Sequence, residues 1–401
     1  MALVACFDYL GLFSGADAYF YDTFLRLRGE RSVSDRIVIV TIDTNTLHSY
    51  GRWPLKRSYY ARMLDKLDRA AVVGFDLLLM EPGADDPLLA AAIKKHTRVV
   101  LPEYLENPTT ILKPPPGLTT CATGHIHIEP GIDSIVREVF HSIYSNGRLS
   151  SSLTSVMYEL VTGTRLTRAP PPLAADSTAI RQQDLHKINY YGPPGSFRQV
   201  SLADLLSGAV SPALFEDKIV FLGVTAPGIG DAVATPFSQN RNRMAGVEVH
   251  ANIMNNLLKD DSIHQVNGWL YITLLFSASM ALALRLLSLD EKQACLLWLV
   301  SLFCVPTGAY LLLTGADLWL PPTVFMITFT MLFLATHLHR LDDAMRRLDR
   351  EYEVMSALLG RNDGEETRQV RSGGILGLIS EGGVNLPDAP SRRLRSPKRT
   401  W

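Results

Sequence analysis

The chain has 401 residues and a formal net charge of −1, and 47% of its residues are apolar while 20% are charged. This length predicts two or three structural units, and the near-neutral charge argues against a nucleic-acid-binding protein, which normally carries a basic excess. The apolar fraction excludes disorder throughout, and the four cysteines, without a CxxC pair, indicate neither a disulfide framework nor a zinc site.

The chain begins with a short apolar segment that is interrupted early. Asp8 ends the run from Met1 to Phe7, and no basic residue precedes Arg26. Such a segment is neither a signal peptide nor long enough to span a membrane. We therefore expect residues 1–19 to be the stub of an N-terminal membrane helix.

Between residues 20 and 265, strand-like runs alternate with helical patterns. The strand-like runs are apolar or β-branched along their whole length, which is typical of strands buried on both faces of a sheet. Helix-like segments lie between them, so we predict an α/β domain with a mostly parallel sheet sandwiched by helices. The strand-like runs are residues 37–42, 71–75, 99–101 and 218–223, and the helix-like segments are residues 58–70, 87–95 and 247–258.

Polar residues gather where these strands end. Asp43 and Asp76 follow the first two strands directly, and Arg57 opens the helix after the first strand. Ligand sites in parallel sheets form outside the carboxyl ends of the strands, so a polar pocket with two carboxylates and a guanidinium is one interpretation. The alternative is that both aspartates cap turns and that Arg57 is an ion-pair partner for one of them. The candidate ligand-binding residues are Asp43, Arg57, Asp76, Glu103, Thr225 and Asp231.

Two groups of residues raise the question of a metal site. His125 and His127 alternate on a strand-like stretch, so their side chains could share one face, but ordinary strand histidines are the favoured interpretation. Asp43 and Asp76 could hold a divalent metal for hydrolysis, which is the enzymatic alternative. We predict no metal site, no cofactor and no catalytic residue.

Three apolar segments follow the α/β region. They cover residues 268–289, 294–313 and 320–338. Each is about 20 residues long, the length with which an α-helix crosses about 30 Å of hydrocarbon. Three buried core helices are the alternative, but helices that are apolar all round leave no polar face for water. We therefore predict three transmembrane helices over residues 268–338.

Basic residues indicate the orientation of these helices. Arg285 and Lys292 lie at the loop between the first and second segments, whereas the loop between the second and third contains Asp317 and no basic residue. Several arginines follow the third segment, beginning with Arg340. Because cytoplasmic loops are enriched in Lys and Arg, we expect a cytoplasmic C-terminus and an extracytoplasmic domain before Gly268.

A second periodicity continues past the third apolar segment. Apolar residues recur there at alternating steps of three and four, as in the a/d seam of a coiled coil, with charged residues between them. We predict a signalling coiled coil over residues 339–360, formed by a parallel dimer. A single amphipathic helix on the membrane surface is the alternative. The seam residues are Leu338, Leu341, Met345, Leu348, Tyr352, Met355 and Leu359.

A series of motifs occurs in order along residues 20–260. It begins with Tyr21-Asp22 and Arg26 and continues with IVIVTIDTNTL, GRWPLKR, VGFDLLL, GHIHIEPGIDSIVREV, INYYGPPGSFRQVSLADLL, DKIVFLGVTAPGIGDAVATPF and GVEVHANIMNNLL. This series resembles the second family of CHASE domains, which are extracytoplasmic sensory domains associated with cyclases and histidine kinases. The resemblance implies a sensory domain over residues 20–265, followed by membrane helices as is common in that family. It implies no defined ligand.

The resemblance also implies a catalytic output domain after the stalk, commonly a nucleotide cyclase, a diguanylate cyclase or a kinase. Residues 361–401 are short and basic and contain no phosphate loop, cyclase metal motif or kinase catalytic loop, so we expect a disordered tail.

We therefore predict a sensory input module of the bacterial inner membrane. Its expected partners are the lipid bilayer, a second copy of the chain, an unidentified extracytoplasmic ligand and a cytoplasmic signalling protein. A truncated remnant of a CHASE-linked cyclase or kinase is the first alternative, and a metal-dependent extracytoplasmic hydrolase is the second.

Overall fold

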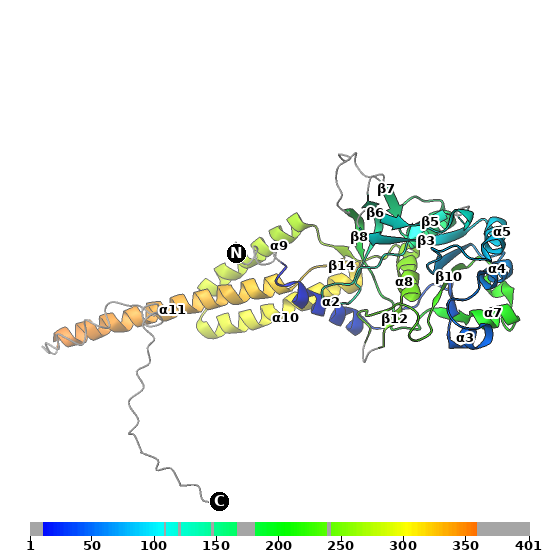
Figure 1. Cartoon of the computed structure of the whole chain (residues 1–401). Coiled ribbons are helices and arrows are strands. Elements are labelled where there is room, and N and C mark those ends of the chain that lie inside the picture. Colours follow the sequence, from blue (N-terminus) through cyan, green and yellow to red (C-terminus); the bar gives the residue numbers. More distant parts are fainter. Residues whose placement is uncertain are drawn as a thin grey trace, which may run out of the picture. The chain divides into compact units, whose positions relative to one another are not determined.

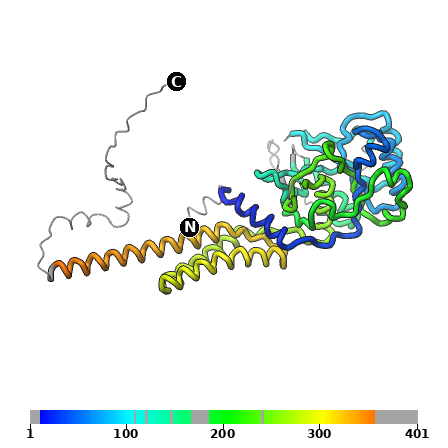
Figure 2. Tube along the Cα trace, turned by 90° about the horizontal axis from the view of Figure 1, so that it is seen from below, coloured from blue at the N-terminus to red at the C-terminus, as the bar shows by residue number. Residues whose placement is uncertain are grey.

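The computed structural model describes residues 11–107, 110–118, 122–145, 148–166, 181–238 and 242–358. The chain divides into two units, one with residues 1–277 and 300–328 and the other with residues 278–299 and 329–401. Figures 1 and 2 trace the chain, and the first described helix, α2 (Ser14–Arg28), leads directly into the α/β domain. Residues 1–10, Leu359 and the expected tail lie outside the described residues.

A seven-stranded sheet forms the centre of the first unit within the described part of the chain. Its strand order is β4-β3-β2-β10-β1-β9, with β5 paired to β3. Among the described strands of this sheet, every pairing is parallel apart from that of β3 with β4. The predicted, mostly parallel sheet is therefore confirmed (Figure 1). The strands are β1 (Ile37–Ile42), β2 (Val72–Asp76), β3 (Val99–Asn107), β4 (Thr110–Leu112), β5 (Ala122–His125), β9 (Arg198–Ser201) and β10 (Ile219–Val224).

Helices cover both faces of this sheet, because its central strands are apolar on both sides. All six residues of β1 are buried, and Val38 and Val40 pack in one hydrophobic cluster while Ile37 and Ile39 pack in another. The first cluster includes residues of α4, α5 and α7, and the second includes residues of α6 and α8. The helices are α3 (Thr44–Tyr50), α4 (Arg57–Lys66), α5 (Asp86–His96), α6 (Leu153–Thr162), α7 (Leu202–Ser207) and α8 (Gly246–Lys259).

Two strand glycines allow the second layer of helices to lie close to the sheet. A Cβ atom added at Gly74 of β2 would collide with the Met157 side chain of α6. One added at Gly223 of β10 would collide with Val247 of α8. Glycine within a strand is typical of places where another element approaches the backbone closely.

A three-stranded antiparallel sheet, ordered β7-β6-β8, stands beside the main sheet and was not predicted. Its strand β8, with the sequence RQQDLHK, lacks the apolar run that identified the parallel strands. The remaining elements are short. They are β6 (Glu138–Ser145), β7 (Arg148–Ser151), β8 (Arg181–Lys187), β11 (Ala232–Val233), β12 (Met244–Ala245), β13 (His264–Gln265), β14 (Leu318–Trp319) and the 3₁₀ turns Pro116–Leu118 and Pro212–Phe215.

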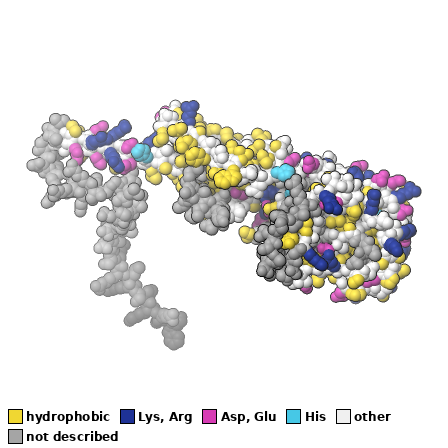
Figure 3. All heavy atoms as spheres, turned by 90° about the horizontal axis from the view of Figure 1, so that it is seen from above, with side chains coloured by type: hydrophobic (Ala, Val, Ile, Leu, Met, Phe, Trp, Pro, Cys, Tyr) yellow, Lys and Arg dark blue, Asp and Glu magenta, His cyan; other side chains and the backbone are white. Residues whose placement is uncertain are grey.

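Three helices in the described part of the chain are long and apolar enough to cross a membrane, as predicted. They are α9 (Gly268–Ser288), α10 (Glu291–Ala316) and α11 (Thr323–Leu358). Hydrophobic side chains gather over the apolar helices in Figure 3, and charged side chains return near the far end of α11.

The helix α11 continues without a break from the third apolar segment into the predicted stalk. The described seam residues form an exposed apolar row along it, with exposed fractions between 41% at Leu341 and 60% at Leu348. The helical part of the stalk prediction is confirmed, whereas the coiled-coil dimer stays a prediction.

Candidate functional site

The first candidate residue, Asp43, caps a helix. Its carboxylate precedes α3 and accepts hydrogen bonds from the Thr46 backbone N–H (2.9 Å) and hydroxyl (2.8 Å). The Ser201 hydroxyl of β9 donates to the same oxygen at 2.9 Å. For Asp43, the structure therefore agrees with the capping alternative.

Asp76 lies at the carboxyl end of β2 in a different environment. The strand β10 separates β2 from β1, and across it Asp76 is level with Thr41, two residues before Asp43. Burial, followed by the charge of Asp231, raises the pKa of the Asp76 carboxyl to about 7. Its Oδ1 lies 3.8 Å from Nε2 of His250, a residue of α8 whose side chain is only 3% exposed.

The Asp76–His250 pair is within ion-pair distance, but burial opposes a charge on either partner. Burial lowers the pKa of His250 to about 4, while that of Asp76 is raised. We therefore assign a protonated carboxyl beside a neutral imidazole between about pH 4 and 7. A buried neutral pair of this kind changes its proton content when its surroundings change.

Arg57 does not bind either of these aspartates. It opens α4 and forms an ion pair with Asp86, and its guanidinium also donates to the Glu81 carbonyl oxygen. Ser58 binds the neighbouring Asp85 through its hydroxyl at 2.7 Å. The expected pairing of Arg57 with Asp43 or Asp76 is therefore wrong, because the loop before α5 offers carboxylates closer to the start of α4.

Glu103 occupies a separate polar pocket. Its side chain is 5% exposed and accepts from the hydroxyls of Thr123 (2.6 Å) and Ser150 (2.7 Å) and from Lys113 Nζ (2.9 Å). Burial alone would raise the pKa of the Glu103 carboxyl, but these hydrogen bonds outweigh burial and lower it. The adjoining cavity has a volume of about 320 Å³ and is also lined by Arg148.

Thr225 and Asp231 belong to the loop after β10. The Thr225 backbone N–H donates to the Ile42 carbonyl oxygen at 3.1 Å, and the Asp231 carbonyl oxygen accepts from the Gly246 N–H at 2.8 Å. The carboxylate of Asp231 acts on Asp76 through its charge. Of the six candidates, the structure thus brings Asp76 and Asp231 together.

The two candidate histidines differ in their surroundings. His125 ends β5 and is buried, whereas His127 lies after the strand, with its Nε2 3.9 Å from Glu129. The pKa of His125 is lowered to about 3, mainly by burial and to a smaller extent by the charges of His127, His250 and His141. Over the described residues, no group of three or more His, Cys, Asp or Glu side chains is arranged to hold a metal ion.

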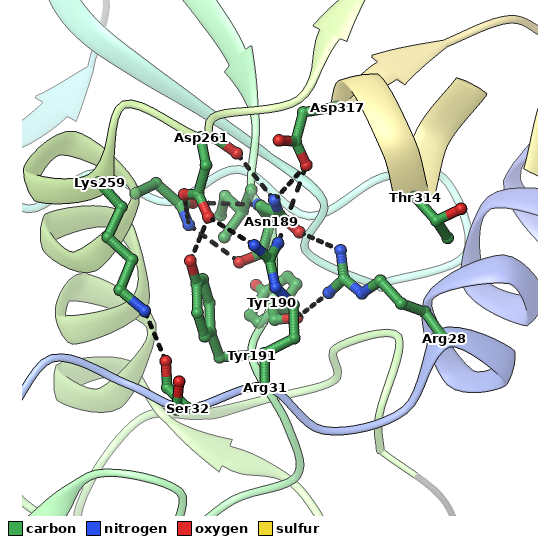
Figure 4. A network of polar contacts seen from close by, with 12 residues as sticks. Arg28, Arg31, Ser32, Asn189, Tyr190, Tyr191, Lys259, Asp261, Thr314 and Asp317 are labelled. Atoms are coloured by element: carbon green, nitrogen blue, oxygen red, sulfur yellow. Dashed lines mark hydrogen bonds and ion pairs between the residues drawn. The ribbon is translucent and has the colours of Figure 1, made fainter. Parts of the chain in front are cut away.

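A second polar cluster, which the sequence analysis did not predict, centres on the fully buried Asn189 (Figure 4). Its side-chain amide donates to the Asp261 carbonyl oxygen (2.7 Å) and to Oδ1 of Asp317 (3.0 Å). Its backbone exchanges two hydrogen bonds with the Asn256 side chain, at 3.0 and 2.9 Å. We call this cluster the polar hub: Arg28, Arg31, Asn189, Tyr191, Asn256, Lys259, Asp261 and Asp317.

Cations from the end of α2 and the segment after it complete the polar hub. Arg28 donates to the Asn189 side-chain oxygen and to the Tyr190 carbonyl oxygen. Arg31 lies 3.3 Å from Asp261 and 3.8 Å from Asp317, with its guanidinium over the Tyr191 ring. The pKa of Arg28 is lowered, mainly by burial and then by the charge of Arg31. The pKa of Asp317 is raised, mainly by burial and then by the charge of Asp261. Arg31 thus lies between two carboxylates, of which Asp261 is the more buried.

The polar hub holds the connection between α10 and α11. Asp317 adopts a left-handed backbone conformation (φ 48°), and its carbonyl oxygen accepts from the His264 N–H at 2.9 Å. Next to it, β13 and β14 pair in parallel, His264 with Leu318 and Gln265 with Trp319. The α/β domain is thus hydrogen-bonded to the segment that immediately precedes α11.

A buried ion pair fixes α2 to the same domain. The Arg137 guanidinium donates to both carboxylate oxygens of Asp22, at 2.7 and 2.8 Å, and the two side chains are 10% and 5% exposed. Asp133 binds Arg137 from the other side at 2.6 Å. Two motifs that lie more than a hundred residues apart in the sequence therefore meet at one guanidinium.

A family model described as the CHASE2 domain matches residues 1–289. The chain belongs to the CHASE2 family. Among curated proteins and solved structures, none matches the chain.

CHASE2 domains are sensory modules, and three helices of the described chain are suited to cross a membrane. These two features indicate an inner-membrane protein with an extracytoplasmic sensory domain. The CHASE2 match contains Arg28, Asn189 and Asp261, whereas Asp317 lies beyond it. The polar hub therefore joins the sensory domain to a residue outside the matched region.

Proposed function

We propose that this protein is a signal-input module in which the CHASE2 domain relays an extracytoplasmic stimulus to the stalk helix α11. The observation that carries the proposal is the contact of Asn189 with Asp317, supported by the pairing of β13 with β14. A ligand that alters the CHASE2 domain would displace the segment before Thr323 and with it the start of α11.

The polar hub is suited to such a relay because it joins three parts of the chain at one place. Arg28 comes from α2, Asp261 follows α8, and Asp317 precedes α11. Buried charged and polar groups tolerate few alternative arrangements, so a shift of one partner favours a concerted shift of the others. A ligand acts on such an element only by binding one of its arrangements better than the other.

The proposed organisation follows the sequence analysis. Residues 20–265 form the CHASE2 sensory domain, 268–338 the membrane region and 339–360 the stalk. Asp76 and Asp231 are the ligand-facing candidates that the fold supports best, because they share the carboxyl edge of the sheet. The exposed apolar row on α11 supports a parallel homodimer, whose output passes to a cytoplasmic signalling protein.

Cysteine crosslinking in native membranes tests the relay. Single cysteines at Met345, Leu348 and Tyr352 are expected to crosslink efficiently between copies, and cysteines at Asp343 and Arg350 weakly. Replacing Asp317 with glycine permits its left-handed conformation but removes the carboxylate bound by Asn189. We expect Asp317→Gly to change this crosslinking profile.

Asp217→Gly is the matched control, because Asp217 is also left-handed (φ 56°) but lies in the exposed turn before β10. It should leave the profile unchanged. Identical profiles in wild type and Asp317→Gly would contradict the relay, and absence of crosslinks at every position would contradict the dimeric stalk.

Impermeant labelling tests the proposed orientation. The Asp35 side chain is 91% exposed in the α/β domain, and Arg350 is exposed on α11. In a background without the native cysteines, a cysteine at position 35 should react with an impermeant maleimide in intact spheroplasts, and one at position 350 only after lysis. The reverse pattern would contradict the orientation.

A further inference from the structure

A large cavity lies where the CHASE2 domain meets the first turns of the apolar helices. Its volume is about 1210 Å³, and its walls come from α2, residues 129–138, β8, α9 and the start of α11. Pockets for small molecules usually measure about 300–1,000 Å³, so this cavity has room for a larger ligand.

One side of the cavity is apolar and belongs to the candidate membrane helices. Ile272 and Leu275 line it from α9, and Val324 lines it from α11. These residues lie within the first two turns of their helices, and Trp269, which is 81% exposed, stands beside them. Exposed tryptophan is typical of the headgroup level of a bilayer. This part of the wall therefore lies near the level at which the headgroups of the lipids meet their acyl chains.

The remaining lining of the cavity includes charged residues, with more carboxylates than cations. Its two cations are already paired, Arg137 with Asp22 and Asp133, and Lys187 with Glu138. The wall also contains Asp17 and Glu129, so its carboxylates outnumber its cations. Such a wall attracts a cationic group and disfavours a lipid whose net charge is negative.

We infer that this cavity binds one phospholipid with an amine-bearing headgroup, drawn from the outer leaflet of the membrane. Its acyl chains would lie along Ile272, Leu275 and Val324, and its ammonium group would face the carboxylates of residues 129–138. This combination of apolar and acidic lining matches the chemistry of an aminophospholipid at the bilayer surface. The inference does not depend on the relay through the polar hub.

Gly15 of α2 provides a direct way to fill the cavity. It lies in the cavity wall, and a Cβ atom added there would meet no atom within 4 Å. Its backbone is helical, so Gly15→Ala adds one methyl group and raises helix propensity. Gly15→Phe adds an aromatic ring at the cavity wall and so reduces the space for a lipid.

The experiment uses the full chain purified in detergent and exposed to vesicles of phosphatidylethanolamine and phosphatidylglycerol in equal amounts. Native mass spectrometry should show one phosphatidylethanolamine retained by wild type and by Gly15→Ala. Gly15→Phe should retain about tenfold less, the effect of displacing roughly two buried methylene groups. Thermal unfolding of both variants should match or exceed that of wild type, which separates a filled cavity from a misfolded protein.

Three outcomes would overturn the inference. One is equal lipid retention by Gly15→Phe and wild type, and another is preferential retention of phosphatidylglycerol. The third is a wild-type dimer that carries no bound lipid and that the substitution Gly15→Phe dissociates into monomers. In that case the cavity would hold a helix of the second copy instead of a lipid. The crosslinking test of the relay is unaffected by any of these results.

Discussion

Arg137→Leu is expected to destabilise the protein by about 3–5 kcal/mol, the usual result of removing one partner from a buried ion pair. The substitution leaves the Asp22 carboxylate, 5% exposed, without the two hydrogen bonds that compensate its burial. It also detaches α2 from the segment before β6. Urea unfolding of the full chain in detergent, followed by tryptophan fluorescence, measures the loss.

The double variant Asp22→Leu with Arg137→Leu separates the ion pair from simple packing. Removal of both charges leaves no buried charge unpaired, so it should recover most of the stability that the single variant loses. Asp133→Asn should cost at most about 1 kcal/mol, because the Asp133 side chain is 45% exposed. A loss below about 1 kcal/mol for Arg137→Leu would show that Asp22 is compensated in another way.

Asp76→Asn and His250→Gln are expected to change the pH dependence of stability in opposite directions. The folded-state pKa of Asp76 is about 7, above its unfolded value, and that of His250 is about 4, below its unfolded value. Between about pH 4 and 6.5, the folded pair holds one proton on Asp76 and the unfolded pair holds one on His250. The wild-type pair therefore contributes almost no pH dependence in this window.

In each single variant, the pH dependence reports the proton binding of the partner that remains. With Asp76→Asn, only unfolded His250 binds a proton in this window, so stability relative to wild type rises as pH rises from about 4 to 6.5. With His250→Gln, only folded Asp76 binds a proton, so relative stability falls as pH rises from about 4 to 7. Each change amounts to about 2–3 kcal/mol over the window.

Urea unfolding at pH 4.5, 5.5, 6.5 and 7.5 measures both slopes against wild type. Asp231, which contributes to the raised pKa of Asp76, is kept in both variants. Relative slopes near zero in both variants would mean that burial shifts neither pKa in the folded protein, contrary to our assignment.

The continuous apolar runs predicted the architecture because burial on both faces removes polar residues from a strand. Residues 37–42 and 218–223 illustrate this, since β1 and β10 are buried throughout. The strand β8 was not predicted, because the formation of a half-polar strand depends on packing against its neighbours rather than on its own composition. The length and hydropathy of α9, α10 and α11 were sufficient to predict the membrane helices.

The candidate site was less predictable because polar residues gain their roles from distant partners. Asp43 could be assigned to a helix cap from local sequence, since Thr46 lies three residues away. Arg57 and Asp86 are 29 residues apart, and Asn189 and Asp317 are 128 apart, so no local pattern indicated either pair. The signal that was available for Asn189 was its place in the INYYGPPG motif, one of the series that resembles the CHASE family.

The position of β10 has a consequence for biogenesis. This strand lies between β1 and β2, yet it is made more than a hundred residues after both. During export, β1 and β2 emerge before the strand that lies between them. The sheet can be completed only after residue 224, the last residue of β10, has crossed the membrane. Until then, the nascent polypeptide presents unpaired edges of two apolar strands, an interval in which a chaperone outside the cytoplasm would have to shield it from aggregation.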